Sequence, residues 1–543
     1  MVIDNSCAGC RSITPSNLKG IVLNLYCFFK YFVTYRGIIE NVMKSELKTV
    51  EKLIHISAWV LAYPDLLYFL RDLNPGWRFI SRFRDDSDVE WSSWKFFIQT
   101  SWFYMLLQFI ISELIRRKRI QLLKYWYIIS SIIFIVTYMG AKQLLILIAQ
   151  PVIFAAIIYF GGKKISIWLT SILLLATYNS LKYKYFFWRF LDSDQDEQVF
   201  LLLFAIAWVE LRCISFCIDY VDEKDQLTKT KDKKQNRVLA LQNIVNLFSY
   251  ALYLPLLYMG PIILYEEFEK SFSVKCEKLS TRVKRFALDM FLFQLYTFLL
   301  DFAFHYVYFF AMQSNLEVRD FLIYFNLPTL AICGGGLWMG FEFHVKYVIS
   351  YGTTGAYARL DNIDPPPTPR CIARIHVYSQ MWRYFDVGLY RFLIKLSAIT
   401  HKLVSSLGTF LFIFMWHGIQ WNIFVWSTLN YIGIIIEFAS KHIGCSTKYK
   451  WFKEKVLRTD AMEVRFVAFL CAPLLGLSAI SNFYLFAGSD VGNLYFGLLH
   501  WPTLYNLSIV YISLYCSCQV GIALQDVPSR TDRKRIVENK VEE

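Results

Sequence analysis

Apolar residues occur in long runs along the chain, separated by short polar stretches. The runs lie near residues 52–70, 97–114, 122–139, 143–161, 165–182, 198–217, 240–265, 286–312, 321–349, 403–437, 464–487 and 494–523. Most approach the roughly 20 residues that a helix needs to cross a hydrocarbon core of about 30 Å. Because an isolated strand leaves its backbone unpaired in a bilayer, we expect helices here. The pattern predicts an all-α polytopic membrane protein with roughly 10–12 transmembrane helices and some re-entrant or interfacial segments.

The two ends of the chain depart from this pattern. Residues 1–49 contain a short apolar stretch that is interrupted by Lys30 and lacks a small-residue cleavage site. We interpret them as an N-terminal extension with an interfacial helix rather than as a signal peptide. Residues 525–543 are polar and basic and are interpreted as a cytoplasmic tail. A single membrane domain is expected at 50–524.

Two segments inside this domain stand apart. Residues 350–402 contain prolines at 365–367 and 369, which exclude a helix, followed by charged residues beside aromatic ones. We expect a proline-rich, aromatic segment on the cytoplasmic side. In 403–437 the stretch from Leu403 to Ile436 has no Asp, Glu, Lys or Arg, and one helix of that length would extend about 51 Å. We therefore expect two helices with a break at 417–420.

Charge agrees with a membrane location. Only 18% of the 543 residues are charged, against about 25% in soluble domains, while 56% are hydrophobic. The net charge of +14 comes from cations concentrated in loops, at 116–119, 223–237, 275–285 and 530–535. The positive-inside rule places these loops in the cytoplasm, next to anionic membrane lipids. This distribution argues against nucleic acid as a partner.

His417 is the first candidate for chemistry, because an ionisable side chain near bilayer depth is costly and usually marks a functional site. Burial keeps an imidazole neutral, as a general base requires. The structural alternative is a core histidine that bonds to a backbone carbonyl or a neighbouring helix.

Asp386 is the second candidate, since a carboxylate among Trp, Tyr and Phe must find a partner. Arg383, three residues earlier on a predicted helix, is the obvious one. The alternative reading of this pair is a local ion pair at the membrane surface. Asp301 and His305, at i and i+4, are expected to bond to each other in a structural role; a proton relay in a transporter is the alternative.

Several motifs together resemble one family, the membrane-bound O-acyltransferase (MBOAT) superfamily, and within it the hedgehog-acyltransferase branch. The likeness extends from about residue 50 to about residue 525. It is carried by EWSSW at 90–94, LRCISF at 211–216, Gly-Pro-Ile at 260–262, the Arg-Leu-Asp, proline cluster and Pro-Arg-Cys of 359–371, WRYFDVGL at 382–389, Trp-His-Gly at 416–418 and the SLYC–GIA stretch of 513–523.

The resemblance implies an MBOAT-type helix bundle that acts as a protein-cysteine N-palmitoyltransferase. Such an enzyme moves palmitate from palmitoyl-CoA to the amine of an N-terminal cysteine on a secreted, hedgehog-like signalling protein. It also implies a multi-pass, monomeric protein of the endoplasmic reticulum membrane, with the Golgi as the alternative. The rival readings are an MBOAT that acylates a lipid or a serine hydroxyl, and an inactive MBOAT-like scaffold or regulator.

The resemblance also assigns residues. His417 matches the family's histidine and Asp386 its paired acid, while Trp382 and Arg383 match positions that line the reaction chamber. We expect Asp386 to hold the chamber through Arg383 rather than to take the proton. Cationic residues of this region, including Arg383, Arg391 and Lys395, are expected to attract the phosphates of CoA.

The resemblance also bears on four further positions. Ser489 stands where the family has a site-lining asparagine, and Asp301 and His305 fall where it has an acid and a histidine. Cys371 matches a cysteine that holds haem b in family members. One departure concerns the interval from Ile394 to Leu407, which is shorter than in the family and has neither proline nor glycine.

Overall fold

The structure is a computed structural model that describes residues 73–191, 196–229, 238–311, 329–396, 402–497 and 504–525. The chain divides into two units, Met1–Leu66 and Leu67–Glu543, and all described residues belong to the second. The predicted N-terminal extension, the apolar run at 52–70 and nearly all of the predicted tail lie outside the described residues.

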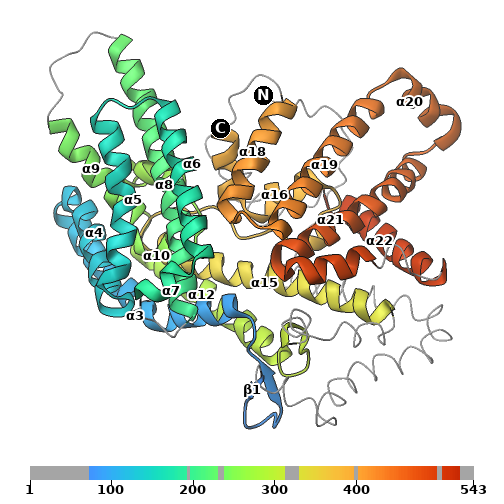
Figure 1. The fold of residues 1–543 in the computed structure, drawn as a ribbon, viewed down its shortest axis with the longest axis horizontal. Helices are drawn as coiled ribbons and strands as arrows, with labels where there is room; N and C mark the ends of the chain where they lie inside the picture. Colours follow the sequence, from blue (N-terminus) through green and yellow to red (C-terminus); the bar gives the residue numbers. More distant parts are fainter. Residues whose placement is uncertain are drawn as a thin grey trace. The chain divides into compact units, whose positions relative to one another are not determined.

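Helices account for nearly all of the described secondary structure, with one short hairpin (Figure 1). The first elements are β1 (Leu73–Pro75), β2 (Phe83–Asp85), α3 (Val89–Lys118), η2 (Ile120–Leu122), α4 (Leu123–Phe134), η3 (Ile135–Met139), α5 (Ala141–Tyr159), α6 (Lys164–Tyr183), α7 (Phe186–Leu191) and α8 (Asp196–Lys229). The middle elements are α9 (Val238–Ala251), α10 (Leu254–Leu257), α11 (Tyr265–Ser273), α12 (Leu279–Ala303) and α15 (Thr329–Leu360). The last are η4 (Ile372–Arg374), α16 (Tyr378–Phe385), α17 (Val387–Leu396), α18 (Lys402–His417), α19 (Trp421–Gly444), α20 (Thr447–Phe452), η5 (Lys453–Leu457), α21 (Asp460–Gly497) and α22 (Leu504–Gln525).

In the described part of the chain, eight helices are long enough and apolar enough to cross a membrane. They are Val89–Lys118, Ile120–Met139, Ala141–Tyr159, Asp196–Asp225, Leu279–Ala303, Trp421–Gly444, Asp460–Gly497 and Leu504–Leu524. Large apolar side chains on their outer faces are exposed, for example Phe103 and Leu114 of α3. Lipid tails, rather than water, suit such a surface. The prediction of an all-α polytopic membrane protein is confirmed.

The core is built around α8. In the most apolar 18-residue stretch of α8, 78% of the residues are buried, as expected for a helix with apolar side chains on all faces. It packs against α3, α5, α6, α9 and α11. Thus α8 forms one wall against which the helices of the site are fixed.

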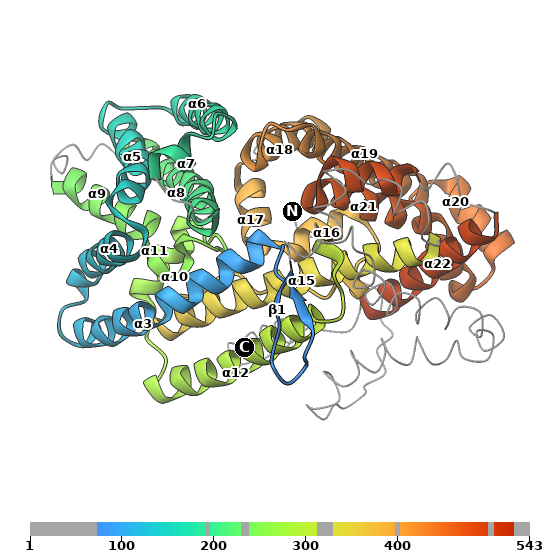
Figure 2. The ribbon, with the colours of Figure 1, turned by 60° about the horizontal axis from the view of Figure 1, so that its bottom comes forward.

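The long helix α15 connects this part of the fold with the C-terminal helices. It packs along α12 and also contacts α3, α10, α21 and α22 (Figure 2). Gly352 of α15 lies directly against the ring of Phe293 of α12, where a Cβ atom would clash. After α15 the proline cluster has no helix or strand, in agreement with the expectation that it is not helical, and η4, α16 and α17 follow it.

Candidate functional site

His417 is the last residue of α18, and α19 begins four residues later at Trp421. Gly418 has φ +138°, a conformation that residues with a Cβ rarely adopt. The chain therefore leaves the helix directly after the histidine, and the predicted break at 417–420 is confirmed. An imidazole at a helix end is less enclosed by its own backbone than one in the middle of a helix.

This break is held in place by α6. The Nδ2 group of Asn179 donates to the carbonyl of Met415 at 2.9 Å, and its Oδ1 accepts from the N–H of Ile419 at 3.1 Å. One amide side chain thus pairs with the backbone on both sides of His417. The sequence offers no signal for this role, because a lone Asn in an apolar run is indistinguishable from other interhelical polar contacts.

Tryptophan rings surround the imidazole. The rings of Trp416 and Trp426 stand edge-on to it, with centroids at 4.8 and 5.0 Å. A second layer follows, with Trp208 against Trp416 at 5.4 Å and Trp382 against Trp426 at 5.2 Å. We call these four indoles the tryptophan cage. Trp382 is expected to line the chamber, and in the structure only the ring of Trp426 lies between it and His417.

Three of the four indole N–H groups of the cage have an acceptor, whereas that of Trp208 is buried without a partner among the described residues. Trp416 donates to the carbonyl of Ala207 at 3.0 Å. Trp382 donates to Asn430 at 2.7 Å, and Trp426 donates to Asn482 at 3.3 Å. The His417 imidazole, in contrast, forms no hydrogen bond with the described residues. The structural alternative, a histidine tied to a carbonyl or a neighbouring helix, is therefore not what this part of the chain shows, and the ring nitrogens are left for a ligand.

Asp386 is buried between α16 and α17. Its Oδ1 accepts from the N–H of Leu389 at 2.9 Å, which caps α17, and its Oδ2 accepts from the hydroxyl of Tyr351 at 2.8 Å. Burial raises the pKa of this carboxyl above its usual value, and these hydrogen bonds oppose the shift. Both carboxylate oxygens are thus already engaged.

The expected pair between Asp386 and Arg383 is wrong. Arg383 is exposed and lies over the ring of Tyr384 at 5.5 Å, whereas Asp386 is 7% exposed. The two residues are on one turn but point into different environments, because α16 ends at Phe385 and the chain changes direction at Asp386. The partner of the acid, Tyr351, comes from the distant helix α15.

Asp386 reaches the cage through rings rather than through a hydrogen bond to His417. The ring of Tyr351 meets that of Trp208 at 6.3 Å, and Trp208 meets Trp416, the neighbour of the histidine. Within the described part of the chain, Asp386 and His417 form no ion pair. This geometry suits an acid that positions the chamber better than one that takes a proton from the imidazole.

A buried charge cluster stands behind Tyr351. Tyr347, one turn earlier on α15, packs against the ring of Tyr351 at 5.3 Å and donates to Glu90 at 2.7 Å. The ammonium of Lys346 binds Glu90 at 2.7 Å and Asp88 at 2.6 Å. Asp88 in turn caps α3 by accepting from two backbone N–H groups. The EWSSW motif therefore serves to tie the start of α3 to the helix that holds Asp386.

Replacing Tyr351 by Phe tests this arrangement. The ring contact with Trp208 would remain, but the buried Oδ2 of Asp386 would lose its donor. A hydrogen bond to a charged group is worth about 1.5–3 kcal/mol, so we expect kcat/KM to fall roughly tenfold or more. Tyr357→Phe is the control, because the Tyr357 hydroxyl on the same helix has no hydrogen bond to the described residues. Equal activity of the two variants would contradict the role given to Tyr351.

Gly418 gives a second test. Gly418→Ala forces a Cβ into a left-handed backbone conformation and should destabilise the break by about 1–3 kcal/mol. Because a displacement of about 1 Å can cost about 10²-fold in rate, activity should fall further than stability. Gly408→Ala, in the interior of α18 with open space around it, should instead stabilise the helix by about 0.5–1 kcal/mol. The measurements are the thermal unfolding midpoint and the acyl-transfer rate of each variant. Equal losses of rate in Gly418→Ala and Gly408→Ala would contradict the role given to Gly418.

Ser489 follows the kink of α21. Gly488 has φ +81°, so the helix is interrupted directly before Ser489. Phe486, two residues before Gly488, stacks on Phe343 at 4.7 Å, and Phe343 stacks on Phe385, which adjoins Asp386. The structure thus brings this part of α21 to the neighbourhood of the acid, while no contact ties Ser489 itself to His417.

Asp301 and His305 hold the hairpin. The Nδ1 group of His305 donates to the backbone carbonyl of Asp301 at 2.7 Å, and its Nε2 accepts from the N–H of Trp77 at 2.9 Å. The expected bond to the Asp301 carboxylate is not formed; that group accepts from the indole of Trp91. With both ring nitrogens occupied, His305 is poorly suited to relay protons. The structural role expected for the pair agrees with these contacts and stays a prediction, as does its place in the reaction chamber.

Cys371 does not fit a haem. Its side chain is exposed at the start of η4, whereas a haem thiolate sits in an apolar pocket that shields the iron. The adjacent cation, Arg370, lies over the ring of Tyr384 at 4.8 Å. We derive no step through a haem.

Two cations expected to attract CoA already have carboxylate partners. Arg391 binds Glu267 at 2.9 Å, and Lys395 binds Asp219 at 2.6 Å. They fasten α17 to α11 and α8, so their attraction for phosphates is reduced.

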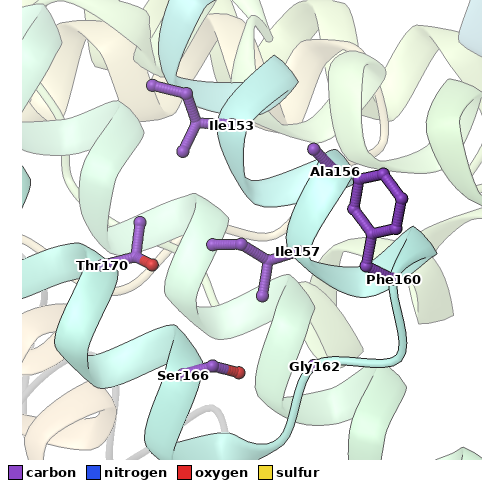
Figure 3. A pocket seen from close by; sticks show the side chains of 7 residues that line it. All are labelled: Ile153, Ala156, Ile157, Phe160, Gly162, Ser166 and Thr170. Carbon is purple, nitrogen blue, oxygen red and sulfur yellow. The ribbon is translucent and has the colours of Figure 1, made fainter.

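A groove lies between α5 and α6 (Figure 3), and no residue of the tryptophan cage lines it. It measures about 460 Å³ and is mostly apolar, with hydroxyls from Ser166 and Thr170 on its α6 wall. These two residues lie on the face of α6 opposite Asn179, because residues 166 and 170 are out of phase with 179 on a 3.6-residue repeat. The groove is therefore an outer surface and not the reaction chamber.

Comparison with known proteins agrees with this geometry. Residues 153–477 match the family described as MBOAT, membrane-bound O-acyltransferase family. The chain is 27% identical over 435 residues to the protein-cysteine N-palmitoyltransferase Rasp of Drosophila melanogaster, covering 77% of this chain and 81% of that protein. It is 26% identical over 401 residues to the protein-cysteine N-palmitoyltransferase HHAT of Mus musculus, covering 71% and 77%. Its identity to the membrane-bound O-acyltransferase gup1 of Schizosaccharomyces pombe is 24% over 271 residues, 45% of each. The chain belongs to the MBOAT family of membrane-bound acyltransferases.

Proposed function

We propose that the protein transfers palmitate from palmitoyl-CoA to the amine of an N-terminal cysteine on a secreted protein. The observation that carries this proposal is His417: an imidazole at a helix break, inside the tryptophan cage, without a hydrogen bond to the described chain. Such a group can act as a base once substrate provides the proton.

The relatives support the choice of acceptor. Three similar proteins share more than two thirds of their length with the chain: two are named protein-cysteine N-palmitoyltransferases, Rasp and HHAT, and the third is named protein-cysteine N-palmitoyltransferase HHAT-like protein. The yeast O-acyltransferase shares less than half of its length. An amine acceptor on a cysteine is therefore favoured over a lipid or serine hydroxyl. For a secreted acceptor we propose the endoplasmic reticulum membrane as the location, with the Golgi as the alternative.

The ends of the helices support an orientation. Arg116, Arg117 and Lys118 close α3, and Arg282 at the start of α12 binds Glu113 of α3 at 2.6 Å. These basic groups share one end of the bundle, which the positive-inside rule assigns to the cytoplasm. Palmitoyl-CoA would enter from this end and the acceptor from the other.

The reaction then needs two proton transfers, one to His417 and one from it, and the exchange of a C–S bond for a C–N bond. The cysteine nitrogen attacks the thioester carbon of palmitoyl-CoA, and His417 accepts a proton from that nitrogen. The tetrahedral intermediate collapses, the C–S bond breaks, and the thiolate of CoA leaves with the proton from the imidazolium. A well-placed base contributes about 10²–10⁴-fold, and holding both substrates together adds to this. The surrounding indoles exclude water and so disfavour hydrolysis of the thioester.

Purified protein with labelled palmitoyl-CoA and a peptide that begins with Cys tests the proposal. The control is the same peptide with an acetylated N-terminus, which has no free amine. We expect label on the free-amine peptide alone. Label on neither peptide, from folded protein, would contradict the proposal and favour an inactive regulator, a reading that the short interval from Ile394 to Leu407 also supports.

A further inference from the structure

Lys182 lies on the inward face of α6. The buried residues of this helix, Ile167, Ser171 and Leu175, follow one another at intervals of four. Lys182 comes seven residues after Leu175, which is two helical turns, and so continues the same stripe. Its side chain is half-buried, whereas Lys184, on the opposite face, is exposed.

The same face of α6 binds the end of α18. Asn179, which pairs with the backbone at Met415 and Ile419, precedes Lys182 by three residues and is its neighbour on the helix surface. One further turn carries α6 past the end of α18, where His417 lies. Lys182 is therefore one turn of α6, about 4.5 Å of helical rise, from the residue that bonds to the backbone on both sides of His417.

The ammonium of Lys182 forms no ion pair or hydrogen bond with the described part of the protein. A cation directed towards the interior of a membrane protein is costly unless it meets a negative charge, and such groups usually mark a functional site. A partner supplied by the substrates would explain its position.

Palmitoyl-CoA phosphates are poor candidates for that partner. Lys164, at the start of α6, binds Asp222 near the end of α8. The two helices therefore run antiparallel, and the end of α6 with Lys182 lies near the start of α8. In the orientation proposed above, this is the end away from the cytoplasm, where the acceptor arrives.

We propose that Lys182 stabilises the oxyanion of the tetrahedral intermediate formed at His417. This inference rests on the proposed function. When the cysteine nitrogen attacks, the two electrons of the carbonyl π bond move to the thioester oxygen, which becomes negative. The ammonium faces this charge without changing its own protonation, and the charge is lost again when the carbonyl reforms and the C–S bond breaks. A fixed positive charge in a water-poor site is effective for such work. The same charge disfavours a protonated acceptor amine near His417.

The other reading of Lys182 is an interfacial lysine whose head group extends to water along an apolar stem. In that case its charge would matter for membrane placement and not for the rate of transfer. The two readings differ in kcat.

The test compares Lys182→Met, Lys182→Arg and the matched control Lys184→Met in the full chain. For Lys182→Met we expect kcat to fall about 10²–10³-fold, the size found when one oxyanion donor is removed, with KM for palmitoyl-CoA changed less than about threefold. Lys182→Arg should recover most of the activity, and Lys184→Met should match the unchanged protein. Size-exclusion profiles and thermal unfolding of each variant report folding separately from rate.

Unchanged kcat in Lys182→Met would overturn the inference, as would an equal loss in Lys184→Met. So would a Lys182→Met defect confined to KM. Transfer by the unaltered protein to the Cys peptide tests the proposed function itself. If that transfer is absent, the slow hydrolysis of palmitoyl-CoA passes through the same kind of oxyanion, and the ratio of its rates in the Lys182 and Lys184 variants still decides the role of Lys182.

Discussion

His417→Ala is expected to abolish palmitate transfer while the protein still folds and inserts into the membrane. We expect this result because the imidazole is the group in the tryptophan cage that can accept the proton of the attacking amine. The loss should be at least about 10²–10⁴-fold, the contribution of a well-placed base. Folding should survive, since the ring makes contacts with Trp416 and Trp426 but no hydrogen bond to the described chain.

The matched control is His442→Ala. His442 is an exposed histidine near the end of α19, so its removal should leave transfer unchanged. The measurement is the initial rate of label transfer to the Cys peptide, with the amount of folded protein determined by size-exclusion chromatography. Retained activity in His417→Ala would remove the histidine from the mechanism.

Asp386→Asn is expected to lower transfer by about 10-fold or more and to leave folding intact. The Asn Oδ1 can still accept from the N–H of Leu389, so the cap of α17 persists, while the negative charge that faces Tyr351 is lost. Asp386→Ala removes the cap as well and should cost about a further 1 kcal/mol of stability. If Asp386→Asn retained full activity, the chamber would not depend on this charge.

The same variant gives a pH test. Burial raises the pKa of Asp386 above 3.8, so the folded protein binds the proton more tightly than the unfolded chain does. This stabilisation is complete below pH 3.8 and is lost as the pH rises through the higher pKa of the folded state. Asp386→Asn lacks this titration, so its thermal midpoint should rise relative to that of the unchanged protein as the pH increases from about 4 towards neutrality. A constant difference across that range would contradict the assignment.

The position of the helix break could be predicted from sequence because two independent constraints coincide there. The uncharged stretch from Leu403 to Ile436 is too long for one crossing, and Gly418 follows a polar side chain near its middle. Both constraints are local, so neither requires knowledge of a partner helix. The structure places the break between His417 and Trp421.

The partners of the site could not be predicted in this way. Arg383 seemed the natural partner of Asp386 because it is near in sequence, yet the chain turns at the end of α16 and the acid bonds to Tyr351 of α15. Asn179 and Trp208 gave no signal at all, because an Asn or a Trp in an apolar run is usually core. Only the packing of distant helices identifies them.

The two hydrogen bonds between Asn179 and the backbone beside His417 have a consequence for when the reaction centre forms during synthesis. These bonds join residues 236 and 240 positions apart, so the histidine is held by a helix that is synthesised long before it. Trp426 and its acceptor Asn482 on α21 come later still. A nascent chain that has inserted α3 to α15 already contains much of the membrane bundle and yet has no reaction centre. Premature termination before α21 would therefore yield a largely inserted protein that lacks the complete surroundings of His417 and cannot transfer an acyl group.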